Sequence, residues 1–143
     1  MKGLVVYLCG PIDCVDPESA GNWRRDVSQY LKEEGILTFD PFLAWGGLPV
    51  TRTVEAHPLK AIARVDLYAV LSSDVVLARI SKDVPTCGSY IEIGYALALG
   101  IPVVIWSDNP PPFLKGAVPE ERIVGTPERI LAGLLAIQKE ITE

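Results

Sequence analysis

The chain has 143 residues, of which 49% are hydrophobic, so it can bury one substantial core and we expect a single domain over residues 1–143. Its formal net charge of −5 argues against a nucleic-acid polymer or an anionic membrane as the main partner, because either would require a basic face. Because the N-terminal apolar run is too short for a signal peptide and no stretch approaches the roughly 18 apolar residues of a membrane span, we expect a cytoplasmic protein that acts on small molecules.

The first half of the chain alternates apolar runs with helical patterns. A β-branched apolar run ends at Gly10-Pro11, which is typical of a buried strand followed by a turn. A second such run ends at Asp40-Pro41. The loop after it is long for a compact domain, so it is a candidate pocket wall or lid, with surface packing as the alternative. The expected elements are a strand over 4–9, a helix over 18–34, a strand over 36–39, a loop over 42–53 and a helix over 58–72.

The second half continues this alternation. Gly88 and Ser89 are typical of a loop that leads into a helix, residues 96–99 are good helix formers, and Gly100 with Pro102 supplies the stop. The last helix is expected to begin with Thr126 as N-cap and Pro127 in its first turn. The expected elements are a strand over 74–80, a helix within 86–100, a strand over 102–106, a rigid loop over 107–116, a short strand over 121–124 and a helix from 127 to about 142.

Strands that alternate with helices predict an α/β fold. We expect a doubly wound, flavodoxin- or Rossmann-like parallel sheet of about five strands with helices on both faces. In such sheets ligands bind outside the carboxyl ends of the strands, at the switch point of strand order. Three loops are expected at that edge, and their candidate substrate-binding residues are Gly10, Pro11, Ile12, Asp13, Asp40, Thr86, Gly88 and Ser89.

Several common catalytic and metal-binding patterns are missing from the sequence. There is no dinucleotide-binding or triphosphate-binding glycine loop and no nucleophile elbow, and His57 is the only histidine, which makes a Ser-His-Asp triad improbable. Three cysteines with one distant histidine do not make a zinc site, so we interpret the thiols as small packing residues. The sequence therefore favours catalysis by carboxyl groups, and we expect no metal or organic cofactor.

Glu92 is the one acid in an otherwise uncharged helical segment. Ser89-x-x-Glu92 fits a capping box, in which the two side chains satisfy backbone N–H groups at the helix start. A functional carboxylate is the alternative, and spacing alone leaves both open. Asp66 interrupts the apolar stripe of its own helix, whereas Asp74 opens a strand and is expected to cap or turn there.

Four segments together resemble the nucleoside 2-deoxyribosyltransferase family and its relatives, the nucleoside 5′-monophosphate N-glycosidases. They are YLCGPI near the N-terminus, FDP after the second strand, the block from Asp66 to SSDVVLA, and GSYIEIGYALALGIPVVI. The resemblance covers roughly residues 4–106, and the last segment is its most specific part. It implies that Glu92 is the catalytic nucleophile, that Tyr7 orients it, and that Asp66 lies near the base or sugar.

The resemblance implies cleavage of the N-glycosidic bond of a (deoxy)nucleoside through a covalent glycosyl-Glu92 intermediate, with transfer of the deoxyribosyl group to another base. Thr86 departs from the transferases, which commonly carry Asp there, and agrees with the N-glycosidases, which often carry a hydroxyl residue. Two alternatives therefore stay open: a hydrolase that releases the base from nucleoside 5′-monophosphates, and a non-catalytic nucleoside-binding module.

The resemblance also implies partners and auxiliary residues. The partners are a nucleoside or nucleotide, a free base and further copies of the chain, since sites of this family are completed by a neighbouring subunit. Residues 110–114 are a candidate contact between copies. Arg24 and Lys115 are candidate cations for a 5′-phosphate, and Trp45 or Phe42 is a candidate for stacking on the base, with core packing as the alternative use of either ring.

Overall fold

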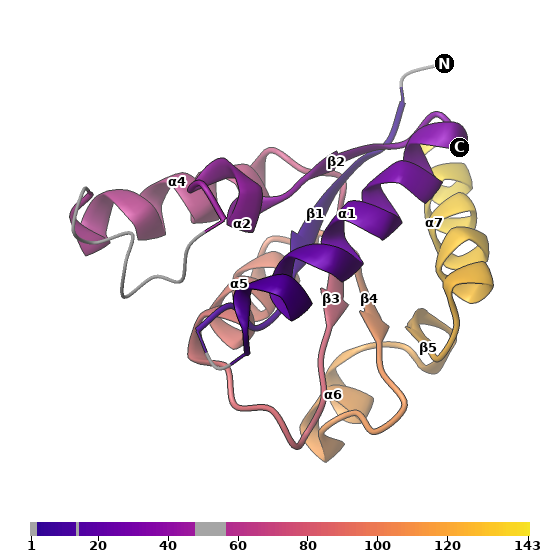
Figure 1. Ribbon diagram of the computed structural model, residues 1–143. Helices are drawn as coiled ribbons and strands as arrows, with labels where there is room; N and C mark the ends of the chain where they lie inside the picture. The colour runs from indigo at the N-terminus through magenta and orange to yellow at the C-terminus, as the bar shows by residue number, and fades with distance from the viewer. Residues whose placement is uncertain (1–2, 14, 48–56) are drawn as a thin grey trace.

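The computed structural model describes residues 3–13, 15–47 and 57–143 as one parallel sheet with helices on both faces (Figure 1). The strands are β1 (Val5–Cys9), β2 (Leu37–Phe39), β3 (Val75–Arg79), β4 (Val103–Trp106) and β5 (Ile123–Val124). The helices are α1 (Pro17–Glu33), α2 (Pro41–Ala44), α4 (Leu59–Leu71), α5 (Cys87–Ala98), α6 (Pro112–Ala117), the 3-10 turn η1 (Glu120–Arg122) and α7 (Pro127–Thr142). The predicted α/β fold is confirmed.

The strand order is β2-β1-β3-β4-β5, and all four pairings are parallel. The chain winds from β1 outward to β2 and then returns to the other side of β1 with β3. The order therefore reverses between β1 and β3, and the crevice outside their carboxyl ends is where such sheets bind ligands. This is the edge that the sequence predicts for the site.

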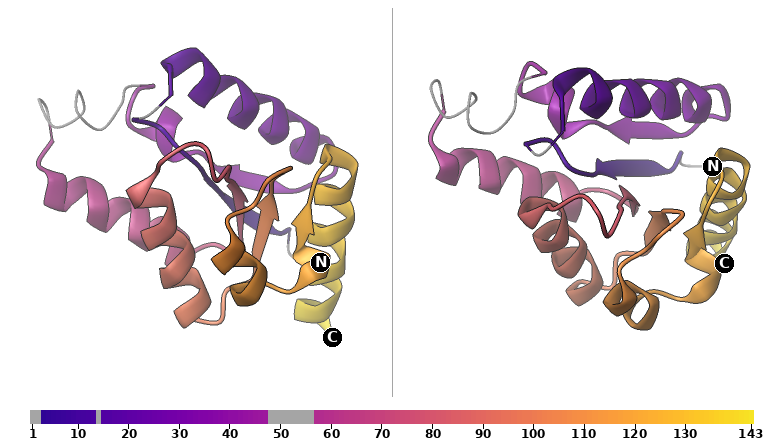
Figure 2. Two further views of the ribbon diagram at one scale, coloured as in Figure 1. Left: turned by 90° about the horizontal axis from the view of Figure 1, so that it is seen from below. Right: turned by 60° about the horizontal axis from the view of Figure 1, so that its bottom comes forward.

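The two faces of the sheet bury two separate sets of apolar side chains. Along β1, Val6 and Leu8 pack with the residues of α1 and α7, whereas Tyr7 and Cys9 pack with those of α4, α5 and α6. Figure 2 shows α1 on one side of the sheet and α5 and α6 on the other. Because successive side chains along a strand point to opposite faces of the sheet, the position of each β1 residue decides which layer of helices it contacts.

Two short helices occupy segments that we expected to be loops. Asp40 caps α2 by accepting a hydrogen bond from the Leu43 backbone N–H at 3.1 Å, and Pro41 stands in the first turn, where its missing N–H costs nothing. Pro112 likewise stands in the first turn of α6, although the N-cap of that helix, Pro111, supplies no side-chain hydrogen bond. The expectation of a loop was wrong for the residues of these two helices, and residues 48–53 of the first loop lie outside the described residues.

Helix α5 ends as the sequence predicts. Gly100 adopts a positive φ of 75°, a backbone conformation that residues with a Cβ rarely adopt.

Among the described residues, none of the helices combines the length and apolar character that crossing a bilayer would require.

Candidate active site

The central contact of the site joins β1 to α5. The Tyr7 hydroxyl donates a hydrogen bond of 2.5 Å to Glu92 Oε2, across 85 positions of sequence. Tyr7 is fully buried, and its ring stacks on Phe39 with the ring centres 5.8 Å apart. The packed ring fixes the direction of the hydroxyl, so Glu92 is held in one orientation.

Glu92 takes no part in a capping box. The N-cap of α5 is Thr86, which has an extended backbone and whose hydroxyl oxygen accepts a hydrogen bond from the Ser89 N–H at 3.4 Å. Helix α5 therefore begins three residues earlier than the capping-box interpretation requires, and Ser89 lies inside its first turn. That interpretation was wrong, because Thr86 already supplies the cap and leaves the Glu92 side chain available to β1.

Burial sets the protonation state of Glu92. Desolvation raises its pKa from the ordinary value of 4.5 to about 7, while the hydrogen bond from Tyr7 opposes the rise and the nearby charge of Asp66 adds to it. A helix N-terminus would favour the ionised carboxylate. Glu92 lies beyond the first turn of α5, which holds no acidic residue, so burial outweighs the helix dipole. Near neutral pH the carboxylate and the acid are both populated.

A second carboxyl group, that of Asp66, forms a cluster with Tyr7 and Glu92. Asp66, on α4, interacts electrostatically with both Tyr7 and Glu92 and accepts a hydrogen bond of 2.9 Å from the Trp45 indole N–H. Burial raises the pKa of Asp66, and the bond from Trp45 lowers it in part. The Trp45 ring in turn lies 5.0 Å from the ring of His57. Two carboxyl groups with raised pKa values thus face one tyrosine.

Sequence reasoning did not identify the contacts of Trp45 and Cys9. The sequence offered Trp45 for base stacking or for the core, whereas its N–H holds Asp66. We interpreted Cys9 as a packing thiol, but its Sγ lies 3.5 Å from Glu92 Oε1. The alternation of β1 was the available signal for Cys9, because it places that residue on the same face as Tyr7.

Arg24 is turned inward rather than toward a ligand. Its guanidinium is fully buried and donates to the Gly10 carbonyl at 2.9 Å and to the Ala20 carbonyl at 2.8 Å. Its Nε lies 3.6 Å from Asp40 Oδ1. These bonds tie the turn after β1 to α1 and to the start of α2, so Arg24 does not act as the exposed phosphate-binding cation that we considered.

Gly10 is required by the packing around this turn. A Cβ at Gly10 would lie 2.9 Å from Cζ2 of Trp23 and 3.3 Å from the Arg79 carbonyl oxygen. No side chain fits there without displacing its neighbours. The backbone after β1 can therefore approach α1 and β3 closely only with glycine at this position.

The remaining candidate residues take different places around the cluster. Pro11 and Ile12 are half-buried and Asp13 is exposed, all just beyond the carboxyl end of β1. The Thr86 hydroxyl donates to Ser89 Oγ at 2.8 Å, and Gly88 beside them has open space where a Cβ would stand. Asp74 has a structural role, because its carboxylate accepts the Val5 N–H at 2.9 Å.

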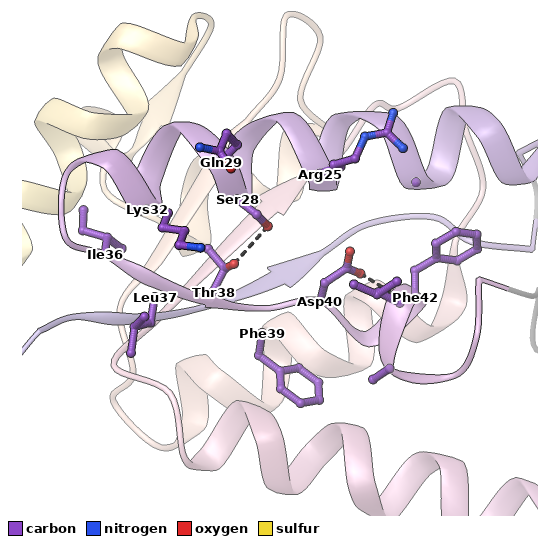
Figure 3. Close-up of a pocket in the computed structure, with 13 residues that line it drawn as sticks. Arg25, Ser28, Gln29, Lys32, Ile36, Leu37, Thr38, Phe39, Asp40 and Phe42 are labelled. Atoms are coloured by element: carbon purple, nitrogen blue, oxygen red, sulfur yellow. Dashed lines mark hydrogen bonds between the residues drawn. The ribbon is translucent and has the colours of Figure 1, made fainter.

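Two hollows lie beside the cluster rather than over it. One, of about 710 Å³, follows the outer edge of β2 and is lined by Thr38, Phe39 and Asp40 together with residues of α1 (Figure 3). Another, of about 510 Å³, opens at the carboxyl ends of β1, β3 and β4 on the α1 side, next to Pro11. Glu92 lines neither hollow. The candidate active site is therefore located by the two carboxyl groups with raised pKa values and not by the size of a hollow. The described residues contain no group of metal-binding side chains.

Comparison with known proteins identifies the family. The family model for nucleoside 2-deoxyribosyltransferases matches residues 6–132. The chain belongs to the nucleoside 2-deoxyribosyltransferase family. This match confirms the resemblance seen in the sequence and includes Tyr7, Asp66 and Glu92 within its span.

Solved structures agree with this assignment at the level of the fold. A 2-deoxyribosyltransferase from Leishmania mexicana superposes with a TM-score of 0.59 at 21% identity, over 79% of this chain and 70% of that one. A 2-deoxyribosyltransferase from the psychrotolerant bacterium Bacillus psychrosaccharolyticus gives 0.61 at 18% identity, over 80% and 82%. A conserved protein from Enterococcus faecalis gives 0.57 at 26% identity, over 75% and 65%.

No match was found among curated protein sequences. The family is one of enzymes that act on nucleosides and bases, which are small-molecule substrates. The α/β fold of this chain, with its five-stranded parallel sheet, matches that of deoxyribosyltransferase structures.

We expect Glu92→Gln to change how stability depends on pH. The pKa of Glu92 is raised from 4.5 to about 7, so its contribution to stability is complete below about pH 4.5 and is lost as pH rises through 7. Above pH 7 the folded wild type carries a buried carboxylate at a cost on the order of 3 kcal/mol, which neutral Gln avoids. The free energy of unfolding should be measured in urea at about pH 5 and about pH 8. The value of the variant relative to that of the wild type should be higher at about pH 8 than at about pH 5.

The exposed Glu121 offers a matched control, Glu121→Gln, for the chemical change itself. Parallel pH dependences of the wild type and Glu92→Gln would contradict the burial of an ionisable carboxyl group at position 92.

Proposed function

We propose that the protein is a nucleoside 2-deoxyribosyltransferase in which Glu92 carries the sugar. The observation that supports this best is the 2.5 Å hydrogen bond from Tyr7 to Glu92 at the carboxyl edge of the sheet, in a chain that belongs to this family. An N-glycosidic bond breaks through an oxocarbenium-like transition state, which is positive at C1′. A carboxylate held against that carbon stabilises the charge and can bond to it.

In the first step a Glu92 carboxylate oxygen attacks C1′ of the sugar. The C1′–N bond breaks, and its electron pair leaves with the base. Asp66 acts as general acid and gives its proton to the departing base. The raised pKa of Asp66 supports this role, because the carboxyl group must still hold a proton when the base leaves.

In the second step a nitrogen of an acceptor base attacks C1′ and displaces the Glu92 carboxylate. The electron pair of the C1′–O bond returns to Glu92, and Asp66 takes the proton that the acceptor base loses. Two displacements at C1′ give transfer with retained configuration. No metal or organic cofactor takes part in either step.

The substrate is proposed to lie across the carboxyl ends of β1 and β3. The segment from Gly10 to Asp13 would receive the 5′ side of the sugar, because it follows β1 at the carboxyl edge of the sheet. Asp40, at the corner after β2, and Thr86, Gly88 and Ser89, at the start of α5, would complete the binding site.

Hydrolysis of nucleoside 5′-monophosphates is the second candidate. Thr86 favours it, since this chain lacks the Asp that transferases of the family commonly carry there. In that case water attacks the glycosyl-Glu92 ester, and Asp66 accepts the proton of the water. The difference between transfer and hydrolysis is which nucleophile reaches C1′.

The deciding measurement is an HPLC assay with each deoxynucleoside and each deoxynucleoside 5′-monophosphate, with and without a second free base. A new nucleoside that appears only with acceptor base is the expected result. Free base from monophosphates alone would establish the hydrolase instead. Ligand-induced thermal stabilisation without any product would establish a non-catalytic binding module.

Glu92→Gln should lower product formation by roughly 10⁴-fold or more while the protein stays folded, because the nucleophile is lost. Mass spectrometry of the wild type, quenched with a slow substrate, should find the added sugar on Glu92. Substantial turnover by the Gln variant would contradict the nucleophile assignment.

Asp66→Asn should slow cleavage by about 100-fold or more for ordinary purine nucleosides, whose base must be protonated as it leaves. An N7-methylated purine carries a cationic base that leaves without a proton, so the same variant should cleave it at close to the wild-type rate. Equal losses on both substrates in steady-state kinetics would contradict the general-acid role.

We further propose that copies of the chain associate through α4. This helix extends beyond the sheet (Figure 1). Its exposed apolar side chains include Val65, Tyr68 and Leu71, with Tyr68 70% exposed. In the contact that we considered from the sequence, residues 110–114, Phe113 is 86% exposed but Leu114 is buried.

Light scattering should find a dimer or larger species that Tyr68→Asp converts to monomer, while Phe113→Asp leaves it intact. The reverse pattern would locate the contact at α6.

A further inference from the structure

Cys9 lies against the oxygen of Glu92 that Tyr7 leaves free. It is the last residue of β1, two positions after Tyr7 and on the same face of the sheet. Its side chain is fully buried, and its Sγ is 3.5 Å from Glu92 Oε1, whereas Tyr7 bonds to Oε2. Each oxygen of the carboxylate thus has one donor from β1.

The thiol has one proton and two acceptors within reach. Its Sγ is also 3.5 Å from the Ser89 carbonyl oxygen in the first turn of α5. Backbone carbonyls inside a helix already accept an intrahelical N–H, whereas an ionised Glu92 oxygen is the stronger acceptor. Burial and the charge of Glu92 both raise the pKa of the Cys9 thiol, so it keeps its proton and remains a donor while Glu92 titrates.

We propose that Cys9 is a positioning residue that donates its S–H to Glu92 and, together with Tyr7, favours the ionised, correctly oriented carboxylate. Cys9 itself touches no substrate. Its importance for turnover rests on the proposed function of Glu92 as nucleophile, but its effect on the ionisation of Glu92 does not.

Three other titratable groups act on Glu92 or Cys9 from the surrounding elements. Tyr7 faces Glu92 from β1 and Asp66 from α4, while Arg24 of α1 acts on both Glu92 and Cys9 from a greater distance. Burial and the charge of Glu92 raise the pKa of Tyr7 above its ordinary range, so it stays neutral. Among these three groups, Asp66 is the one whose charge can change together with that of Glu92, so the measurement is repeated with Asp66→Asn as the background.

The test compares Cys9→Ala with Cys9→Ser, which are both smaller than Cys and differ by one hydroxyl donor. The pKa of Glu92 is read directly by ¹³C NMR of the side-chain carboxyl, with the signal assigned by its loss in Glu92→Gln. Cys9→Ala should raise that pKa by roughly half a unit or more, because a hydrogen bond to the charged form is lost. Cys9→Ser should leave it at or below the wild-type value.

An unchanged pKa in Cys9→Ala, or equal shifts in Ala and Ser, would overturn the proposal. Cys87→Ser, at an exposed position, is the matched control and should not move the Glu92 signal. Where either variant fails to fold, Cys9→Val and Cys9→Thr replace the pair, since they share one shape and differ in the hydroxyl.

Turnover supplies a separate readout. The acidic limb of the kcat/KM profile should move to higher pH in Cys9→Ala and not in Cys9→Ser. If Glu92→Gln retains full turnover, the proposed function fails while the NMR comparison still decides the role of Cys9. If Glu92→Gln is inactive and the limb stays in place in Cys9→Ala, only the role of Cys9 fails.

Discussion

A carboxyl group buried against the end of a parallel sheet is the constraint on which the rest of this structure depends. Burial raises the pKa of Glu92, and the hydrogen bond from Tyr7 limits that rise, so the balance rests at about 7. A donor on β1 is therefore as important as the carboxylate on α5. A buried carboxylate requires hydrogen-bond donors. Strand β1 is otherwise apolar, but on the face that packs against α5 it supplies a hydroxyl at Tyr7 and a thiol at Cys9.

Topology brings these groups together. Strand β3 pairs with β1, and α5 follows β3 and packs across both, so Glu92 falls opposite Tyr7 although they are 85 positions apart. Helix α4 lies beside α5 and adds Asp66 to the same cluster. The switch point of strand order thus supplies an open edge, and the helices on one face supply the acids.

A second charge is buried at the turn after β1 and has a different task. Arg24 satisfies the carbonyls of Gly10 and Ala20 and lies near Asp40, which holds two site loops in fixed relation. Glu92 keeps a carboxyl group that titrates near neutrality. Arg24 instead donates from its two terminal nitrogens to backbone carbonyls, and its Nε faces Asp40 at 3.6 Å. Buried ions at this edge cost stability. Hydrogen bonds to the backbone offset that cost for Arg24, whereas Glu92 keeps a titratable carboxyl group.

The sequence by itself determined the alternation of strands and helices, the stop of α5 at Gly100, and the identity of Tyr7, Asp66 and Glu92 as candidates, because these follow from local pattern and motif. It left open whether Glu92 served a capping box, since Ser89 and Thr86 are equally able to cap a helix. Only the tertiary structure decided that Thr86 caps, that Trp45 holds Asp66, that Cys9 meets Glu92 and that Arg24 turns inward. Those contacts join segments distant in sequence, and they depend on strand order and side-chain packing that no local pattern encodes.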